Sequence, residues 1–404
     1  MLIVDPVRLA RRQMEIDRLR TADFPHLLAH KADRMRLSPL ALLRGSGPLF
    51  YEVLARHPAL AEGPPGAGWL VGDAHIENFG AYRTGKLSVR ETEQSHAREP
   101  VVFDLNDFDD AFVGPWRLDV LRLLTSLVLG ARESGADGAH TIELADALIG
   151  AYVKSALHGL APPAAPAVVR ALTRNVRTRT RKALLEARTE VVHGARRFAR
   201  GAHFVELPKK LVMKAERAFA RYVGSLAKRE RPVPDAFRVI DTAFRVAGTG
   251  SLGCLRIAVL VRGKGGVDGG WIFDMKAEGR PSAHCLVRAP KIDPAERVCK
   301  ALVECLAQPP ALIGRTHLRG ESMFVRRLMP QEDKIEFGEV SPGELMPLVR
   351  HFGALLGAGH RRGAMRTPKA SWTEKDRAGL VSRALALAGL HEAMYLAYCR
   401  ISRR

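Results

Sequence analysis

The spacing of apolar and polar residues changes twice along the chain and divides it into three parts. From Met1 to about residue 235 the spacing is mostly helical, with short apolar runs at 69–71 and 101–105 that predict buried strands. The run at 117–132 is apolar on nearly every side, which predicts a helix buried inside a core. Residues 1–235 are therefore expected to form a helical lobe with a few inserted strands.

The second part, residues 236–330, shows the pattern typical of strands. The predicted strands are 237–246, 254–261, 271–276 and 322–328. One helix is predicted at 294–307. The third part, 331–404, is helical again, and Ser341 and Glu344 have the spacing of a capping box at a helix start. This order of helical, β-rich and helical parts predicts an α+β fold.

Positive charge is concentrated in one stretch of the chain. The sequence has 63 Lys and Arg against 43 Asp and Glu, a net charge of +20, and residues 170–231 hold 18 of the bases but only 5 acids. We expect this stretch to form exposed helices. It is either a solvated surface or a site for nucleic acid or an acidic partner. Few aromatic residues interleave with the bases, which favours the solvated surface.

Cysteine usage and hydrophobicity limit the class of protein. The five cysteines never occur as C-x-x-C and lie beside no histidine cluster with zinc-ligand spacing, which argues against a disulfide framework and a structural zinc site. The start of the chain lacks a signal-peptide core, and no run is long and apolar enough to span a membrane. We expect a bacterial cytoplasmic protein without membrane association.

A G-x-G-x-x-G motif occurs at residues 248–253. Alone it is weak, because glycines also mark ordinary turns. In a dinucleotide fold the loop leads into a helix, whereas here it leads into a β-branched run that predicts a strand. A glycine loop between two strands is typical of kinase-type phosphotransferases, in which it covers a nucleotide's phosphates. The candidate nucleotide-binding residues are Gly248, Gly250, Ser251 and Gly253.

A kinase-type site also needs a lysine on the third strand, and Lys276 has that place. Strand alternation puts Trp271, Phe273 and Met275 on the core face and Lys276 on the other face. The alternative is a solvated lysine at a strand end. The helix at 294–307 should then supply a carboxylate that holds Lys276. Glu296 and Glu304 are the candidates, and Glu296 is the residue that we predict.

Two polar segments upstream could carry the chemistry. Residues 72–78, Gly-Asp-Ala-His-Ile-Glu-Asn, follow one predicted strand, and residues 104–110 end another with four aspartates. Phosphoryl transfer needs a carboxylate at the acceptor hydroxyl and hard oxygen ligands for Mg²⁺. Clustered carboxylates also repel one another unless a cation lies among them. The alternative for each residue is a turn former or a helix cap.

Further residues within and near these segments could have supporting roles. His75 is either a metal ligand, a base or, as we favour, a side chain that fixes the loop by hydrogen bonds to the backbone. Asp119 either interacts with the dipole of the buried helix or hydrogen-bonds the 72–78 loop from beneath. Arg44 could pair with the acidic loops, but a purely structural role is favoured for it, as it is for His360.

The chain resembles a bacterial family described only as domain of unknown function 2252. The segments that carry the resemblance are SPLALLRGSGPLFYEVL, GDAHIENFG, VVFDLNDFDDAFVGPWRLDVLRLLTSLVL, GTGSLGCLRIAVLV and MFVRRL. That family is in turn similar to the protein kinase superfamily, especially its aminoglycoside and choline kinase branch. The resemblance implies a two-lobe kinase-like fold with Asp73 as catalytic base, Asn78 and Asp107 as Mg²⁺ ligands, and Asp119 as the brace.

The order of the motifs departs from that superfamily. There the glycine loop and lysine precede the catalytic loop and acidic turn, whereas here they follow them. A circular permutation explains this order if 331–404 completes the large lobe.

The expected function is an ATP- and Mg²⁺-dependent phosphotransferase acting on a hydroxyl of a small molecule. Asp73, Asn78 and Asp107 would be the catalytic residues, and Asn78, Asp107 and Asp109 the metal ligands. One alternative is an inert or nucleotidyl-transferring kinase-like protein whose segment 170–231 binds nucleic acid or an acidic partner. A further alternative is metal-dependent phosphoester hydrolysis, although such two-metal sites tend to need more histidines.

Overall fold

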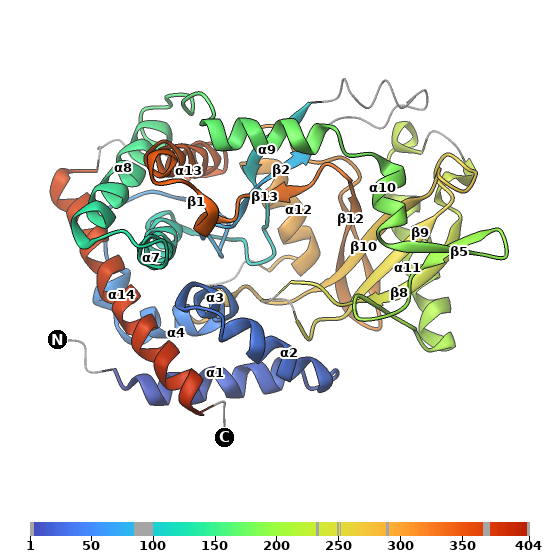
Figure 1. Ribbon diagram of the computed structural model, residues 1–404, viewed down its shortest axis with the longest axis horizontal. Coiled ribbons are helices and arrows are strands. Elements are labelled where there is room, and N and C mark those ends of the chain that lie inside the picture. The colour runs from blue at the N-terminus through green and yellow to red at the C-terminus, as the bar shows by residue number, and fades with distance from the viewer. Residues whose placement is uncertain are drawn as a thin grey trace.

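The computed structural model describes residues 4–84, 100–231, 234–248, 250, 252–287, 291–366 and 372–401. Short helices come first: α1 (Pro6–Arg20), α2 (His26–Met35), α3 (Pro39–Gly45), α4 (Gly47–Arg56) and α5 (Pro58–Ala61). Asp5 caps α1 by accepting a hydrogen bond from the Val7 amide at 2.9 Å, and proline occupies the first helical position. The first helix packs against the last, α14 (Glu374–Ile401) (Figure 1).

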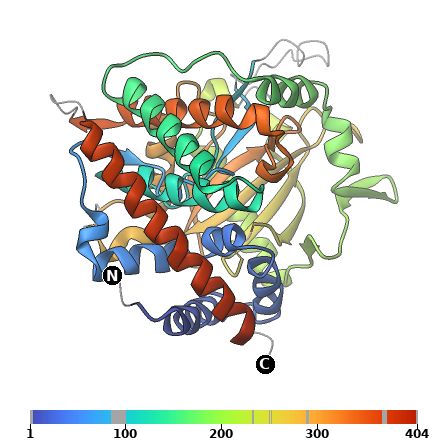
Figure 2. The ribbon, with the colours of Figure 1, turned by 60° about the vertical axis from the view of Figure 1, so that its left-hand side comes forward.

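The helical core is built around α7 (Arg117–Glu133), which is buried along almost its whole length, as its all-round apolar pattern predicts. It contacts α14 and α8 (Gly138–Ala156), and α8 packs along α13 (Pro342–Arg362). The turned view in Figure 2 shows α14 crossing the front of this helical part. Helices from both ends of the sequence thus form one hydrophobic core.

Two small sheets join segments that lie far apart in the sequence. In one, β1 (Ala67–Leu70) pairs with β4 (Phe112–Pro115) and with β14 (Ala364–Arg366). In the other, β2 (Phe79–Arg83) pairs with β3 (Val101–Leu105) and with β13 (Asp333–Lys334). The strands that flank the 72–78 loop are therefore fixed by residues from the C-terminal third of the chain.

The largest sheet in the described part of the chain is antiparallel, with the order β11-β12-β10-β9-β8-β7. Its strands are β7 (Phe204–Val205), β8 (Val239–Arg245), β9 (Arg256–Val261), β10 (Trp271–Glu278), β11 (Gly314–Leu318) and β12 (Glu321–Leu328). Helix α12 (Pro294–Cys305) lies between β10 and β11 in sequence. The predicted strands and the predicted helix of this region are confirmed, whereas β11 was not predicted.

The two faces of this sheet differ in chemistry. Trp271, Phe273 and Met275 share a cluster with Phe219 and Tyr222 of α11 (Lys209–Ser225). Lys276 alternates with these residues and lines cavities on the other face. The predicted orientation of Lys276 is thereby confirmed.

The basic stretch is not wholly helical, which corrects the sequence interpretation. It contains α9 (Ala167–Arg177), α10 (Arg181–Glu186) and α11, but also a hairpin of β5 (Thr189–Val192) and β6 (Ala195–Phe198). His193 and Gly194 both have positive φ, as a two-residue hairpin turn requires. The β-branched residues before this turn and the glycine within it are typical of a hairpin. This signal was overlooked because the stretch was interpreted from its charge.

The capping-box prediction is also wrong in detail. Ser341 is the residue that precedes α13, but its side chain makes no capping hydrogen bond. Glu344 instead accepts a hydrogen bond from the Val168 amide at the start of α9, at 3.2 Å. A contact between elements has replaced the local one.

The coarse predictions hold: the fold combines helices with antiparallel sheets, as expected for the α+β class. All five cysteines are free thiols. No helix in the described part of the chain has both the length and the hydrophobicity needed to cross a bilayer.

Candidate functional site

The 72–78 loop is held from beneath by a buried carboxylate. Asp119, in the first turn of α7, accepts hydrogen bonds from the backbone amides of Val71 at 2.7 Å and Gly72 at 3.0 Å. The Tyr51 hydroxyl donates to the Gly72 carbonyl at 2.5 Å. Gly72 has a φ of 84°, and a Cβ atom there would lie 1.9 Å from the Asp110 carbonyl oxygen. The bracing contact expected of Asp119 is therefore present. At position 72 only glycine fits against the Asp110 carbonyl.

Asp119 is itself the end of a buried hydrogen-bond chain. Its Oδ2 atom lies 3.0 Å from Nε2 of His360 on α13. Nδ1 of His360 lies 3.0 Å from the hydroxyl of Tyr152 on α8. All three side chains are fully buried. This chain connects helices from two distant parts of the sequence to the loop.

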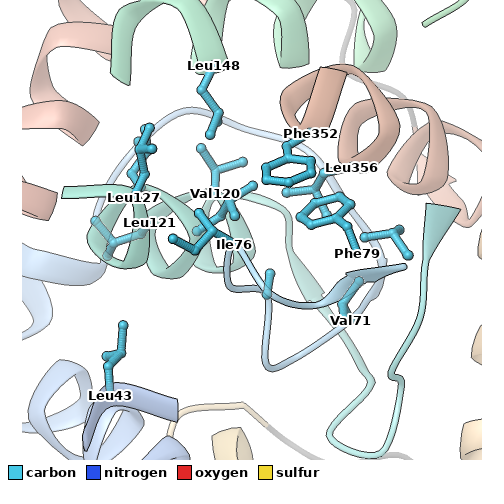
Figure 3. Packing of buried hydrophobic residues seen from close by; sticks show 14 of the residues in the cluster. Leu43, Val71, Ile76, Phe79, Val120, Leu121, Leu127, Leu148, Phe352 and Leu356 are labelled. Carbon is cyan, nitrogen blue, oxygen red and sulfur yellow. The ribbon is translucent and has the colours of Figure 1, made fainter. Parts of the chain in front are cut away.

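Hydrophobic packing fixes the far half of the loop (Figure 3). Ile76 packs into the core, and its amide donates to the Ser126 hydroxyl at 3.1 Å. Phe79 stacks on Phe352 of α13, with ring centroids 4.3 Å apart and planes 9° from parallel. Contacts of both kinds leave the polar residues between these anchors little freedom to move.

Asp73 is oriented by a buried arginine. Oδ1 of Asp73 accepts hydrogen bonds from Nε of Arg122 at 2.6 Å and lies 2.5 Å from its Nη2. Arg122 is fully buried on α7, with its guanidinium 4.8 Å from the ring centre of Phe50. Burial acts to lower the pKa of Arg122, but its hydrogen bond to Asp73 and the negative charges around it, that of Asp73 foremost, together raise it. Arg122 therefore stays charged and holds one carboxylate oxygen of Asp73, while Asp73 lines a cavity.

His75 has the loop-fixing role that we favoured. Its Nδ1 accepts a hydrogen bond from the Glu77 amide at 3.2 Å, and its Nε2 lies 3.8 Å from Oδ2 of Asp73. Burial lowers the pKa of His75 well below its usual value, and the positive charges of Arg44 and Arg122 act in the same direction. The ring is neutral at physiological pH and stabilises the loop.

Arg44 pairs with the 72–78 loop, which is the less favoured of the two roles considered for it. Its guanidinium lies 2.6 Å from Oε2 of Glu77, and Nζ of Lys334 lies 2.6 Å from the same oxygen. Burial acts to raise the pKa of Glu77, but these two cations outweigh it and lower the pKa.

Asn78 fastens the 72–78 loop to residues 104–110, which are called the acidic turn below. Its Nδ2 donates to the carbonyl oxygens of Asp73 at 3.0 Å and Asp107 at 3.1 Å, while its Oδ1 accepts from the Asp107 amide at 2.8 Å. Oδ1 of Asp107 accepts from the Asp109 amide at 3.1 Å. The amide oxygen of Asn78 keeps one lone pair for a further partner. The two segments predicted to work together therefore form one rigid unit.

Lys276 contacts carboxylates other than the one expected. Its ammonium group contacts Oδ2 of Asp109 directly and lies 3.7 Å from Oε1 of Glu278. Glu296 instead pairs with Lys300 and Arg315, each at 3.0 Å. The prediction that Glu296 holds Lys276 is therefore wrong for this structure.

The reason lies in the way α12 faces the site. Arg297 is buried on its inner side, and its Nη2 donates to the carbonyl oxygens of Asp109 at 2.8 Å and Gly279 at 3.2 Å. Glu296, one position earlier, points instead to the basic residues along the helix and on β11.

The glycine loop closes over the same region. Gly248, Gly250 and Gly253 line a cavity together with the 72–78 loop, whereas Ser251 lies outside the described residues. Gly253 has a φ of 96°, and a Cβ there would lie 2.3 Å from the Arg20 carbonyl oxygen. Arg34 of α2 hydrogen-bonds the Gly248 carbonyl. The first two helices therefore hold the loop from outside.

Two adjoining cavities contain these groups. The larger cavity, about 590 Å³, is lined by Asp73, Asn78, Asp107, Asp109, Lys276, Glu278 and the three described glycines. The smaller cavity, about 280 Å³, has a mixed lining whose apolar part includes Leu105, Val298, Leu302, Ile313 and Phe324. Asn106, Asp107, Asp109, Gly248 and Lys276 line both. The structure thus brings together every described site residue predicted from sequence except Glu296.

Sequence reasoning missed an ion cluster on the sheet face of the smaller cavity. Asp274 is buried between Arg245 at 2.7 Å and Arg256 at 2.5 Å. Burial acts to raise the pKa of Asp274, but the two arginines outweigh it and lower the pKa far below its usual range. Asp274 lies two residues before Lys276, so strand alternation could have placed it on this face.

Glu278 was missed for the same reason, since it lies two residues after Lys276. Burial raises its pKa to about 7; the nearby Lys276 and Arg297 act against this, and the negative charges of Asp107 and Asp110 add to it.

The profile of a family described as "Uncharacterized protein conserved in bacteria (DUF2252)" matches residues 23–401 of this chain. Neither a curated protein nor a solved structure matches it.

Proposed function

The chain belongs to the DUF2252 family of bacterial proteins, and from its site we propose that it is an ATP- and Mg²⁺-dependent phosphotransferase acting on a hydroxyl of a small molecule. One observation carries the proposal. Asp73, Asn78, Asp107, Lys276 and the three described glycines of the glycine loop come from segments up to 203 residues apart, and all line one cavity. These are the groups that phosphoryl transfer requires.

The proposed fold is a circularly permuted two-lobe kinase fold. The glycine loop joins β8 to β9, Lys276 lies on β10, and a helix follows, which is the order of the corresponding parts in kinases. The catalytic loop and the acidic turn precede this unit in the chain. The pairing of β1 with β14 and the packing of α1 against α14 support a large lobe completed by residues 331–404.

The nucleotide would occupy both cavities. Its base fits the apolar part of the smaller cavity's lining, since aromatic rings bind by burying apolar area. Its phosphates would lie at the junction, beside Lys276 and Gly248, which line both cavities. The acceptor would enter the larger cavity next to Asp73.

The oxygen donors at the junction fit Mg²⁺, a hard cation that is bound by one or two carboxylates together with phosphates and water. Asp107, Asp109 and the amide oxygen of Asn78 would hold it. Among the described residues, no three His, Cys, Asp or Glu side chains are arranged to hold a metal ion. Nucleotide phosphates would therefore complete the shell. When bound, the metal neutralises charge on the phosphates during transfer.

The protein's own residues would position the acceptor. Arg122 holds Oδ1 of Asp73, so the remaining oxygen can accept the hydrogen bond of the acceptor hydroxyl. As the hydroxyl oxygen bonds to the γ-phosphorus and the bond to ADP breaks, the hydroxyl proton passes to Asp73. Lys276 supplies a fixed positive charge to the phosphates.

Replacing Lys276 by Met tests the nucleotide site. We expect affinity for Mg·ATP to fall at least about tenfold, because one charge-assisted contact to phosphate contributes about 1.5–3 kcal/mol. Isothermal titration measures it. Lys300→Met is the matched control, since Lys300 lies on the exposed side of α12, and it should bind ATP like the wild type. Equal affinity in all three proteins would remove Lys276 from the nucleotide site.

A second candidate function concerns the basic segment 170–231. Helix α11 carries an exposed stripe of bases, which are Lys210, Lys214, Arg217 and Arg221, and α9 carries Arg170, Arg174 and Arg177 in the same spacing. Such stripes suit a phosphate backbone or an acidic partner. We also propose a cytoplasmic location, with which five free thiols are compatible.

Salt dependence tests the nucleic-acid candidate. If α11 neutralises phosphates, the logarithm of DNA affinity should fall by about 0.9 for each phosphate neutralised, per logarithmic unit of salt. Replacing Lys210 and Lys214 by Gln should remove about two phosphate contacts and so make this slope shallower by about 1.8. A flat response to salt in fluorescence anisotropy would contradict nucleic-acid binding.

A further inference from the structure

Glu278 is a buried carboxylate whose negative charge is only partly balanced by the positive charges near it. It lies at the end of β10 and its side chain is only 4% exposed. Among the described residues, its Oε1 atom has no hydrogen-bond partner. Its ion pair with Lys276 is loose, at 3.7 Å, because the ammonium group is in direct contact with Asp109. An ionised carboxylate in such surroundings is strongly unfavourable unless another cation is near.

Other charges around Glu278 make the need for a cation greater. Asp107 and Asp110 act on it with negative charge, whereas Lys276 and Arg297 act with positive charge. Both cations have other partners: Asp109 for Lys276, and backbone carbonyls for Arg297. Glu278 lines the larger cavity together with Asp107 and Asp109. The cavity wall thus has carboxylates from the sheet on one side and from the acidic turn on the other.

We propose that Glu278 is a ligand of a second divalent cation, shared with Asp107 and bound together with the phosphates of the nucleotide. This inference rests on the proposed phosphotransferase function. The first cation is that of Asn78, Asp107 and Asp109; the second lies on the sheet side of the cavity. Since the described side chains form no three-ligand site by themselves, phosphate oxygens and water complete the second shell, as is usual for Mg²⁺ and Mn²⁺.

The second cation has a clear electrostatic role. A second cation would add positive charge beside the phosphates, where negative charge is redistributed during transfer. A cation at Glu278 also compensates that carboxylate without the help of Lys276. With Asp109 taken by the first cation and Glu278 by the second, Lys276 would be free to contact the phosphates.

Counting bound Mn²⁺ tests the inference without measuring turnover. The wild-type chain is mixed with the non-hydrolysable β,γ-imido analogue of ATP, and free Mn²⁺ is followed by electron paramagnetic resonance. We expect two Mn²⁺ per wild-type chain. In Glu278→Gln, which keeps the shape of the side chain, one of these sites should weaken at least about tenfold. The matched control is Glu321→Gln, an exposed residue on the wall of the same cavity, which should keep both sites.

The outcomes separate this inference from the proposed function. If the wild type binds the analogue with a single Mn²⁺, or if Glu278→Gln binds two as tightly as the wild type, the second site is disproved and the phosphotransferase proposal stands. If the wild type does not bind the analogue, both fail. Affinity for the analogue in excess chelator should be the same in Glu278→Gln and wild type. A similar loss with and without Mn²⁺ would mean that Glu278 only positions Lys276, which overturns the metal proposal.

Discussion

Replacing Asp73 by Asn is expected to lower the turnover of ATP-dependent phosphorylation by about a hundredfold to ten-thousandfold while ATP still binds. The reason is chemical, because an amide can hydrogen-bond the acceptor hydroxyl but cannot take its proton. The shape of the side chain is kept, so Nε of Arg122 retains an oxygen acceptor in place of Oδ1. Steady-state kinetics and ATP titration measure the two effects separately.

Asp23→Asn is the control for this prediction. Asp23 lies on the wall of the same cavity but is exposed at its rim. Its variant should retain turnover within a factor of about three, since surface substitutions change free energies by about 0.5 kcal/mol or less. Full activity in Asp73→Asn would exclude Asp73 as the group that accepts the proton.

Replacing Asp119 by Ala is expected to lower the free energy of unfolding by about 3–5 kcal/mol. The change leaves the buried amides of Val71 and Gly72 and the Nε2 atom of His360 without their acceptor. Urea denaturation at neutral pH measures the loss. Asp146→Ala is the control, because Asp146 is exposed on α8, and its effect should be within about 0.5 kcal/mol.

A loss below about 1 kcal/mol for Asp119→Ala would mean that the loop does not depend on this brace. A second readout is available in the folded variant. Because the loop carries Asp73, turnover should fall further than ATP affinity does.

Local patterns in the sequence were sufficient for much of this site. Strand alternation fixed the side of β10 on which Lys276 lies, since Trp271 and Phe273 had to enter the core. The short apolar runs before Gly72 and Asp107 correctly predicted two strand ends. The glycine motif led into a strand, which distinguished it from a dinucleotide loop.

Contacts between distant segments could not be predicted in this way. Arg122 and Ser126 interrupt an apolar helix in the sequence, and both prove to contact the 72–78 loop. Glu296 had the expected position in sequence, yet the rotation of α12 turns it toward Lys300 and Arg315. Helix rotation and long-range pairing depend on the whole core, which a local pattern does not contain.

The transfer of label from ATP tests the central claim most directly. The protein is incubated with Mg²⁺, a small-molecule extract of bacterial cells as the source of acceptor, and ATP labelled at either the α- or the γ-phosphate. We expect label from the γ-phosphate alone to appear in a new product, and Asp107→Ala to abolish it. Label from the α-phosphate would show nucleotidyl transfer, label released only as inorganic phosphate would show hydrolysis, and ATP left intact would show an inert scaffold. Each of these three results would contradict phosphotransfer.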